Sequence, residues 1–245
     1  MGIEEDEAIT ILVTPVWKDS ARLSVFGREL AVELAKRESA IQWIIADDGS
    51  GEVEVERLGL LRDDFAEVYP HVRVHPAEEH FGKGSVVREA WALEPEASWL
   101  SFVDADGSVS ASDMLDLIES AHESGQSTLA IRKNTEETRV EEGIFRWIRH
   151  HGFLFACHLI LGIRSDDTQC GAKVLKGGDY RKIADQLVEP GLAFDAELLG
   201  VLTAAGLTWR EIPVNWVRKG GSKVHAISDA WKMLCALFRI RRRLR

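Results

Sequence analysis

The stretch from Trp99 to Ser108, WLSFVDADGS, decides the fold, because it joins an apolar run to a pair of carboxylates. Four of its first five residues are apolar, which is typical of a buried strand. Asp104 and Asp106 follow, with Ala105 between them. Two carboxylates placed so close together repel each other unless a cation or a proton lies between them. The stretch therefore predicts either a tight turn or a cation site at the end of a strand.

Similar apolar runs recur along the first half of the chain, and they alternate with segments whose apolar residues have helical spacing. Strands are expected within 8–15, 41–50, 71–76, 98–107 and 127–133. In the second half, helices are expected over about 141–161, 192–206 and 226–240, and strands within 171–178 and 207–217. This alternation predicts an α/β fold with a mainly parallel central sheet flanked by helices.

Composition favours a single domain, because no repeat, low-complexity segment or linker divides residues 1–245. Residues 1–8 form an acidic tail, and 226–245 a basic amphipathic helix. The net charge of -10 argues against a nucleic-acid partner. Three widely spaced cysteines argue against a disulfide framework or a zinc cluster and fit a reducing cytosol. With no secretory signal and no run of about 18 apolar residues, a cytoplasmic location is expected.

Three of the expected strands end in polar residues, at 15–19, at 47–48 and at 104–106. Each has a simpler explanation, since Asp-Gly is a common turn and Asp often caps a helix. Together they favour one ligand site, because ligands of open α/β sheets bind at the carboxyl ends of strands. Mg²⁺ and Mn²⁺ prefer carboxylate and phosphate oxygens, and Mg²⁺ usually takes one or two carboxylates plus substrate phosphates. The pattern thus predicts a metal that holds the diphosphate of a nucleotide-linked substrate.

The segment HFGKGSVVREAW, residues 80–91, is glycine-rich but is neither a Walker sequence nor a GxGxxG motif. Gly82 and Gly84 permit a close backbone approach at the start of a helix. Lys83 between them could then meet an anion or a base edge. The alternative is a glycine-rich turn with a solvated lysine.

Several motifs carry a resemblance to a known family. DDGS, GKG and DADGS, at 47–50, 82–84 and 104–108, resemble those of family 2 glycosyltransferases with the GT-A fold. DDTQCGAKVL, LAFDAELL, EIPVNW and GSKV, at 166–175, 192–199, 211–216 and 221–224, are more specific. They are similar to the dolichyl-phosphate β-glucosyltransferase and polyprenyl-phosphate glycosyltransferase branch. The resemblance extends from about Ile9 to Arg239.

The resemblance implies roles for matching residues. Those implied to bind the donor are Pro15, Trp17, Asp19, Asp48, Lys83, Asp104, Ala105, Asp106, Arg132, Gln169, Arg218, Ser222 and Lys223. Within the Asp-x-Asp motif, Asp106 is the usual ligand of Mg²⁺ or Mn²⁺, with Asp104 beside it. Gln169, Asp167 and Lys173 match an acceptor-side loop, and Ser222 and Lys223 a loop that closes over the diphosphate. Trp17, Asp19 and Ala172 differ from the family's Tyr, Glu and Phe, which bears on donor choice more than on fold.

The resemblance also implies a reaction. It is an inverting transfer of a hexose, with glucose expected, from a donor of the UDP-glucose or GDP-mannose type to a polyprenyl- or dolichyl-type lipid phosphate. A phosphate monoester has its second pKa near ~6, so it needs orienting cations, such as Lys173 and Arg132, more than a base. A hydroxyl acceptor would need a general base, for which Asp167 is preferred over Asp195. Asp195 has an alternative role as a helix cap.

Rival functions remain open at this point. They are a soluble family 2 transferase with a hydroxyl acceptor, a sugar nucleotidyltransferase, and a nucleotide-sugar binding protein without turnover. Neither the membrane anchor of the eukaryotic relatives nor the C-terminal spans of many bacterial ones are found in the sequence.

The tail bears on the acceptor, because its apolar residues have helical spacing and its last seven residues hold five arginines. Such a helix can lie on an anionic membrane surface at the inner face of the membrane, or it can simply pack on the domain. His150, His151 and His158 are interpreted as surface or core residues and not as ligands. Trp209, Trp216 and Trp231 are expected in the core.

Overall fold

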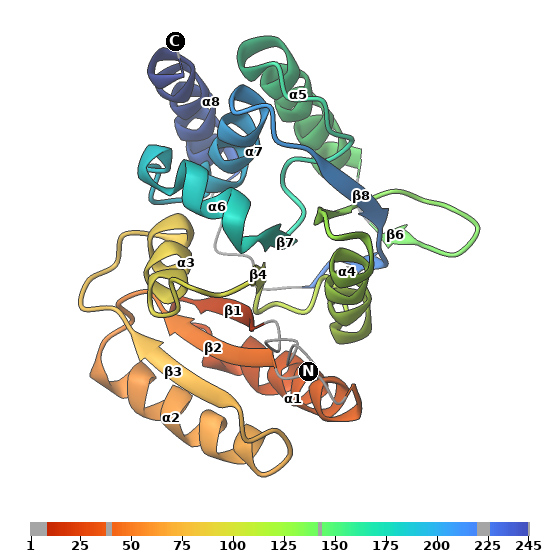
Figure 1. The fold of residues 1–245 in the computed structure, drawn as a ribbon. Coiled ribbons are helices and arrows are strands. Elements are labelled where there is room, and N and C mark those ends of the chain that lie inside the picture. Colours follow the sequence, from red (N-terminus) through yellow and green to blue (C-terminus); the bar gives the residue numbers. More distant parts are fainter. Residues whose placement is uncertain (1–8, 38–40, 142–143, 220–225, 245) are drawn as a thin grey trace, which may run out of the picture.

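The computed structural model describes residues 9–37, 41–141, 144–219 and 226–244. Its main feature is a seven-stranded sheet with the order β3-β2-β1-β4-β7-β5-β8 (Figure 1). These strands are β1 (Thr10–Val16), β2 (Ile41–Asp47), β3 (Val72–Pro76), β4 (Trp99–Val103), β5 (Ser127–Ile131), β7 (Ala172–Lys176) and β8 (Trp209–Pro213). Only β7 runs antiparallel to its neighbours. The predicted α/β fold with a mainly parallel sheet is confirmed.

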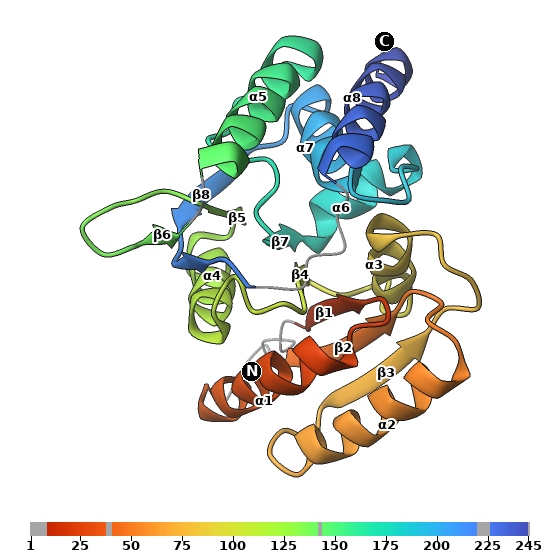
Figure 2. The same ribbon diagram turned by 180° about the vertical axis from the view of Figure 1, so that it is seen from behind.

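Helices cover both faces of the sheet (Figures 1 and 2). On one face lie α1 (Ser20–Lys36), α2 (Glu52–Ala66) and α4 (Ala111–Ser124). On the other lie α3 (Lys83–Ala92), α5 (Ile144–Leu161), α6 (Gly177–Ile183), α7 (Phe194–Ala204) and α8 (Ala226–Arg243). The strands alternate between the two cores, so that Leu12 faces α1 and α2 while Ile11 and Val13 face α3. A short 3-10 helix, Ala184–Gln186, follows α6.

The order of the strands positions the site. After β1, the chain adds β2 and β3 on one side of it and then crosses to add β4 on the other side. This is a topological switch point, where the loops after the strands diverge and leave a crevice. The polar residues that follow β1, β2 and β4 therefore emerge at one edge of the sheet.

Several local predictions need correction. β1 continues through Pro15 to Val16; its pairing with β4 ends at Val13, so the missing N–H of the proline costs no ladder bond on that side. The segment 207–217 forms two strands, because β9 (Trp216–Val217) leaves the main sheet and pairs with β6 (Val140–Glu141). Trp231 is 67% exposed, so its predicted place in the core is wrong.

Capping residues account for the ends of two helices. Ser110 caps α4, as its Oγ accepts a hydrogen bond from the backbone N–H of Asp113 at 3.0 Å. α7 ends just before Gly206, whose φ of +69° suits glycine. Among the residues that the structure describes, no helix combines the length and the apolar character that crossing a membrane requires.

Two helical glycines provide a matched test of this packing. A Cβ on Gly84 of α3 would lie 2.5 Å from Cβ of Phe194 on α7, whereas a Cβ on Gly59 of α2 would meet nothing within 4 Å. Gly84→Ala should lower the free energy of unfolding by about 1–3 kcal/mol through overpacking. Gly59→Ala should raise it by about 0.5–1 kcal/mol through helix propensity. Urea unfolding of both variants checks this; equal effects would contradict the close approach of α3 to α7.

Candidate active site

A chain of four alternating charges lies at the carboxyl edge of the sheet. The Nζ of Lys83, at the start of α3, lies 2.8 Å from Oδ1 of Asp104 and 3.2 Å from Oδ2 of Asp195. The other oxygen of Asp195 accepts a hydrogen bond from Nζ of Lys173 at 2.6 Å. These residues come from α3, the end of β4, α7 and β7, so the chain ties four elements together at one point.

The charges set one another's ionisation. Burial alone would lower the pKa of Lys83, but Asp104 and Asp195 outweigh it and raise that pKa above its ordinary value. Burial would raise the pKa of Asp195, but Lys173 and Lys83 hold it below its usual range. Asp104 differs, because burial, together with the charges of Asp106 and Asp195, raises its pKa despite Lys83. Lys83 therefore stays a cation and Asp195 an anion at neutral pH.

Lys173 and Asp195 have roles other than those predicted. Lys173 is fully buried, and its Nζ also donates to the carbonyl of Cys170 at 2.8 Å. It holds Asp195 and does not reach the surface, so the geometry speaks against a direct contact with an acceptor phosphate. α7 is capped at Ala193 without a side-chain hydrogen bond, so the alternative of Asp195 as a helix cap is wrong. Its low pKa and two ammonium partners also disfavour it as a general base.

Asp106 lies next to this chain and remains accessible. Its Oδ1 accepts the backbone N–H of Ser108 at 2.9 Å, and its Oδ2 lies 3.6 Å from a guanidinium nitrogen of Arg22. Arg22 is itself ion-paired with Asp19, three residues earlier in the chain. Arg22 is not among the residues predicted above, although its i,i+3 spacing from Asp19 at the start of a helix is a usable signal.

The carboxylates fit a metal that takes most of its ligands from substrate. No group of three His, Cys, Asp or Glu side chains able to hold a metal occurs among the described residues. Oδ1 of Asp104 is bound to Lys83, and its Oδ2 packs so closely against Gly171 that a Cβ there would lie 2.0 Å away. Asp106 is the better ligand, and a single carboxylate plus phosphate oxygens suits Mg²⁺ or Mn²⁺.

A second buried ion pair fixes Arg132, the residue after β5. Oδ2 of Asp167 accepts Nε of Arg132 at 2.7 Å, and Oδ1 accepts Nη2 at 2.9 Å. Nη2 also lies 2.9 Å from Nδ1 of His150 on α5. Asp167 is fully buried, and although burial raises its pKa, the charge and hydrogen bonds of Arg132 lower it to about 2. A carboxylate so acidic and so enclosed makes a poor general base, which disfavours the base role predicted for Asp167.

The two ion-pair systems face each other across a narrow cleft of about 70 Å³. Its lining residues are Asp104, Asp106, Ser108, Val109, Arg132, Gln169, Gly171 and Trp216. Carboxylates form one wall, and Arg132, whose guanidinium lies over the ring of Trp216, forms the other. Of the predicted site residues, the structure thus brings Asp104, Asp106, Arg132 and Gln169 together.

Asp48 and Trp17 lie beside α3, in a separate arrangement. The indole of Trp17 stacks on the ring of His80, with centroids 4.1 Å apart. Asp48 is buried; its Oδ1 accepts the backbone N–H groups of Phe81 and Gly82, each at 3.0 Å, and its Oδ2 lies 2.9 Å from Nδ1 of His80. Asp48 thereby fixes the loop that presents Lys83, and its predicted contact with a base or ribose stays a prediction.

The remaining predicted residues that the structure describes are not among those that line the cleft. Pro15 is within β1, Ala105 is buried between the two aspartates, and Arg218 is exposed after β9. Ser222 and Lys223 fall outside the described residues, so their predicted role over the diphosphate stays a prediction.

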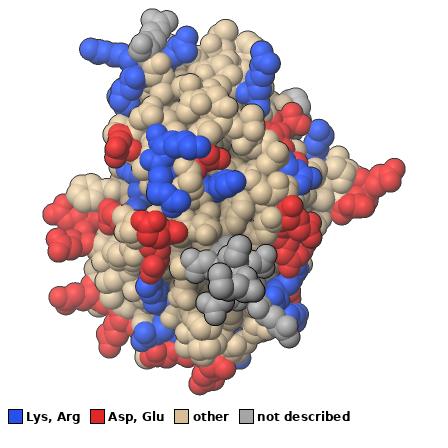
Figure 3. Space-filling view, in the orientation of Figure 1, with Lys and Arg blue, Asp and Glu red and all other residues tan. Residues whose placement is uncertain are grey.

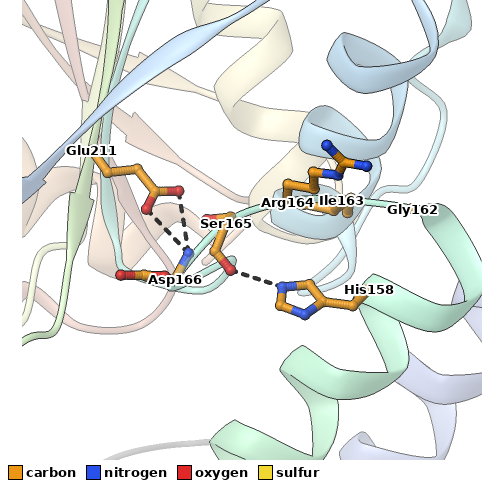
Figure 4. A pocket seen from close by; sticks show the side chains of 7 residues that line it. All are labelled: His158, Gly162, Ile163, Arg164, Ser165, Asp166 and Glu211. Carbon is orange, nitrogen blue, oxygen red and sulfur yellow. Dashed lines mark hydrogen bonds between the residues drawn. The ribbon is translucent and has the colours of Figure 1, made fainter.

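A larger pocket, of about 600 Å³, lies near the same loop but holds none of the strand-end residues (Figure 4). Its polar contacts are internal. His158 contacts the carbonyl of Ser165 at 2.8 Å, and Glu211 accepts the backbone N–H of Asp166. These hydrogen bonds hold the segment that carries Asp167 in place. Because the strand-end residues line the narrow cleft and not this pocket, the cleft is the better candidate site.

Comparisons with known proteins identify similar sequences and similar folds. No family model matches the chain. It is 28% identical to the dolichyl-phosphate beta-glucosyltransferase of Saccharomyces cerevisiae, covering 97% of the chain and 75% of the relative. It is 26% identical to that of Homo sapiens, covering 87% and 68%.

Solved structures give the same fold. Glucosyl-3-phosphoglycerate synthase from Mycobacterium tuberculosis, in complex with Mn²⁺, uridine diphosphate and glucosyl-3-phosphoglycerate, matches 96% of the chain and 80% of its own length, with a TM-score of 0.65 and 14% identity. The chain has the GT-A fold and is similar over nearly its whole length to known glycosyltransferases. The fold and the resemblance predicted from the motifs are thereby confirmed.

The buried pair of Asp167 and Arg132 predicts a pH dependence of stability. Because the pKa of Asp167 is lower in the folded than in the unfolded chain, the pair's stabilisation is present above about pH 4 and is lost as the pH falls toward 2. The difference in unfolding free energy between wild type and Asp167→Asn should therefore shrink by about 1 kcal/mol between about pH 5 and pH 3. Urea unfolding at both pH values measures it, and a constant difference would contradict the assigned ion pair.

Proposed function

We propose that this glycosyltransferase moves a hexose, with glucose the first candidate, from a nucleotide sugar to the phosphate of a polyprenyl- or dolichyl-type lipid, with inversion at the anomeric carbon. The observation that carries the proposal is the cleft with Asp104 and Asp106 on one wall and the fixed cation Arg132 on the other. The relatives named above, dolichyl-phosphate beta-glucosyltransferases, support this choice of sugar and acceptor.

Charge on the departing diphosphate is the main requirement of such a transfer. Asp106, with Asp104 beside it, would hold Mg²⁺ or Mn²⁺, and the metal would supply a Lewis acid that stabilises the leaving group. The complex of the mycobacterial synthase with Mn²⁺ and uridine diphosphate supports a divalent metal and a uridine nucleotide. Lys83 lies close enough to contribute a second positive charge. Lys223 and Arg218 stay candidates for the same task.

The state of the carboxylates supports a phosphate acceptor. A hydroxyl nucleophile needs a base, and both predicted bases, Asp167 and Asp195, are buried, are bound to cations and have lowered pKa values. A phosphate monoester is already largely dianionic above its second pKa of about 6 and needs orientation instead. Arg132 is suited to this, because guanidinium binds phosphate with defined geometry. The hydroxyl acceptor is the alternative that the first experiment below tests.

We place the enzyme at the inner face of a membrane, with α5 and α8 toward the lipid. The two helices pack together at the end of the molecule opposite α2 (Figures 1 and 2). Their outer faces carry four large apolar side chains that are 60% to 75% exposed: Phe155, Leu159, Trp231 and Phe238. An exposed cluster of aromatic and aliphatic residues on helices, flanked by arginines, suits the headgroup region of an anionic bilayer.

The four tail arginines that the structure describes divide into two groups. Arg239 and Arg243 form ion pairs with the buried Glu189, and Arg243 also pairs with Glu197, so these two fasten α8 to the domain. Arg241 and Arg242 are exposed and could meet anionic lipid. Packing on the domain and contact with a membrane, stated above as alternatives, are thus compatible. Figure 3 shows basic side chains beside the uncharged surface at this end of the molecule.

This surface leads to the cleft. Nε2 of Gln169, which lines the cleft, lies 3.8 Å from Sδ of Met233 on α8. A lipid phosphate held in the headgroup region beneath α8 would therefore approach the cleft from the side of Gln169 and Arg132.

A donor-by-acceptor assay tests the function. UDP-glucose and GDP-mannose are offered with a short polyprenyl phosphate or with free sugars, with and without Mn²⁺. We expect metal-dependent transfer to the lipid phosphate, and a loss of at least about a hundredfold in kcat for Asp106→Asn, because the leaving-group charge is then uncompensated. Transfer to free sugars alone would overturn the acceptor, and full activity of Asp106→Asn would overturn the metal role.

Binding to vesicles tests the membrane surface. A double variant, Trp231→Ser with Phe238→Ser, should bind vesicles of phosphatidylcholine and phosphatidylserine at least about tenfold more weakly than wild type. The reason is that the variant loses the apolar surface that would be buried in the bilayer. Leu60→Ser on α2 is the control, since Leu60 is also 67% exposed but lies at the other end of the molecule. Cosedimentation measures both, and equal loss or no loss in the two variants would exclude this surface.

A further inference from the structure

His150 contacts the guanidinium that forms one wall of the cleft, and the motif resemblance gave it no role. It lies on α5, eighteen residues after Arg132 and seventeen before Asp167, and it is nearly fully buried. Its Nδ1 lies 2.9 Å from Nη2 of Arg132 and 3.8 Å from Oδ1 of Asp167. Three segments that are distant in sequence therefore converge on one guanidinium group.

The chemistry of this contact fixes the state of the imidazole. A guanidinium nitrogen can only donate, so Nδ1 of His150 must accept. The ring is then neutral, and its proton is on Nε2. A protonated ring would lose the acceptor and bring a second positive charge against Arg132. Asp167 accepts hydrogen bonds from one edge of the guanidinium, and His150 accepts a hydrogen bond from Nη2 in another direction. Together, the two residues set the plane of the guanidinium.

We propose that His150 is a positioning residue, which orients Arg132 toward the anion that enters the cleft. Asp167 binds Nε and Nη2 along one edge of the guanidinium, and this contact by itself restrains rotation about that edge only weakly. The hydrogen bond from Nη2 to His150, together with the ring of Trp216 under the guanidinium, resists that rotation. The proposal rests on the proposed function, in which the anion that meets Arg132 is the acceptor phosphate.

Three substitutions separate positioning from packing. His150→Asn keeps an acceptor near the place of Nδ1, His150→Phe fills the space without an acceptor, and His150→Ala removes both. We expect His150→Phe and His150→Ala to lower kcat/KM for polyprenyl phosphate by about tenfold to a hundredfold, the worth of one hydrogen bond to a charged group. His150→Asn should recover most of this loss. KM for the nucleotide sugar should change less than twofold to threefold in all three variants.

Three results would contradict a positioning role for His150. Wild-type kinetics for His150→Phe would overturn the proposal, and so would a loss in His150→Asn as large as in His150→Ala, since that pattern follows packing and not acceptor chemistry. An equal rise of both KM values would also contradict it. Unfolding in urea, run on the same variants, identifies any loss that merely follows stability.

The tautomer of His150 can be measured by NMR without an assay of enzyme activity. In ¹⁵N–¹H spectra of histidine-labelled protein, His150 should show the neutral tautomer with its proton on Nε2, and Arg132→Leu should shift the Nδ1 resonance. A proton on Nδ1 at neutral pH would overturn the positioning role. If the tautomer is as expected while lipid phosphate is not a substrate, the proposed acceptor fails and the fixed Arg132 remains to be matched with another anion.

Discussion

The buried ammonium of Lys173 is the constraint on which the rest of the site depends. A lysine with no exposure to water is stable only beside an anion, and Asp195 is the anion that the fold supplies. Because the second oxygen of Asp195 then holds Lys83, the buried pair places a cation at the carboxyl end of β4. Asp104 is in turn bound by that cation. Position and charge at the sheet edge thus follow from one desolvated ion pair in the core.

This arrangement gives the cleft two electrostatic sides. On the side of α3, Lys83 and Lys173 are paired with the two carboxylates Asp104 and Asp195, and Asp106 is the carboxylate best placed for an added cation. On the side of α5, the charge of Arg132 is matched by Asp167, and the pair is enclosed by His150 and Trp216. A metal bound by Asp106 would lie next to the diphosphate on the first side. An anionic nucleophile would lie next to Arg132 on the second. The side chains of the Lys173–Asp195 and Arg132–Asp167 pairs are at most 8% exposed, so these two interactions are strong and little screened by salt.

Sequence reasoning predicted the carboxylate wall of the cleft well, because strand ends in a parallel sheet meet at one edge whatever the packing of the helices. Asp104, Asp106 and Lys83 were found from that rule together with the glycines around Lys83. The other wall was harder. Arg132 was found through a motif resemblance, but His150 lies in an apolar helix, and only the way in which α5 packs brings it to Arg132. No periodicity in the sequence carries that information.

The sequence pattern also did not predict which charged side chains are buried in ion pairs. Lys173 looks like a solvated or substrate-binding lysine, and the arginines at the end of α8 look like one uniform basic surface. The structure instead buries Lys173 against Asp195 and uses Arg239 and Arg243 to reach Glu189 and Glu197. Glu197 and Asp195 both lie in the first turn of a mostly apolar helix, where acidic residues are a usable but weak signal of buried partners. Pairing between distant charges is decided by tertiary contacts, which local spacing does not encode.

The central claim is that the nucleophile is a phosphate and not a hydroxyl group, and the structure of the product tests it most directly. A ³¹P spectrum of the product formed from a short polyprenyl phosphate and the nucleotide sugar shows which oxygen attacked. We expect the monoester resonance of the acceptor to be replaced by that of a phosphodiester, with coupling between the phosphorus and the anomeric proton of a β-linked sugar. A product in which the acceptor's monoester is unchanged and the sugar is attached through a hydroxyl oxygen would contradict it.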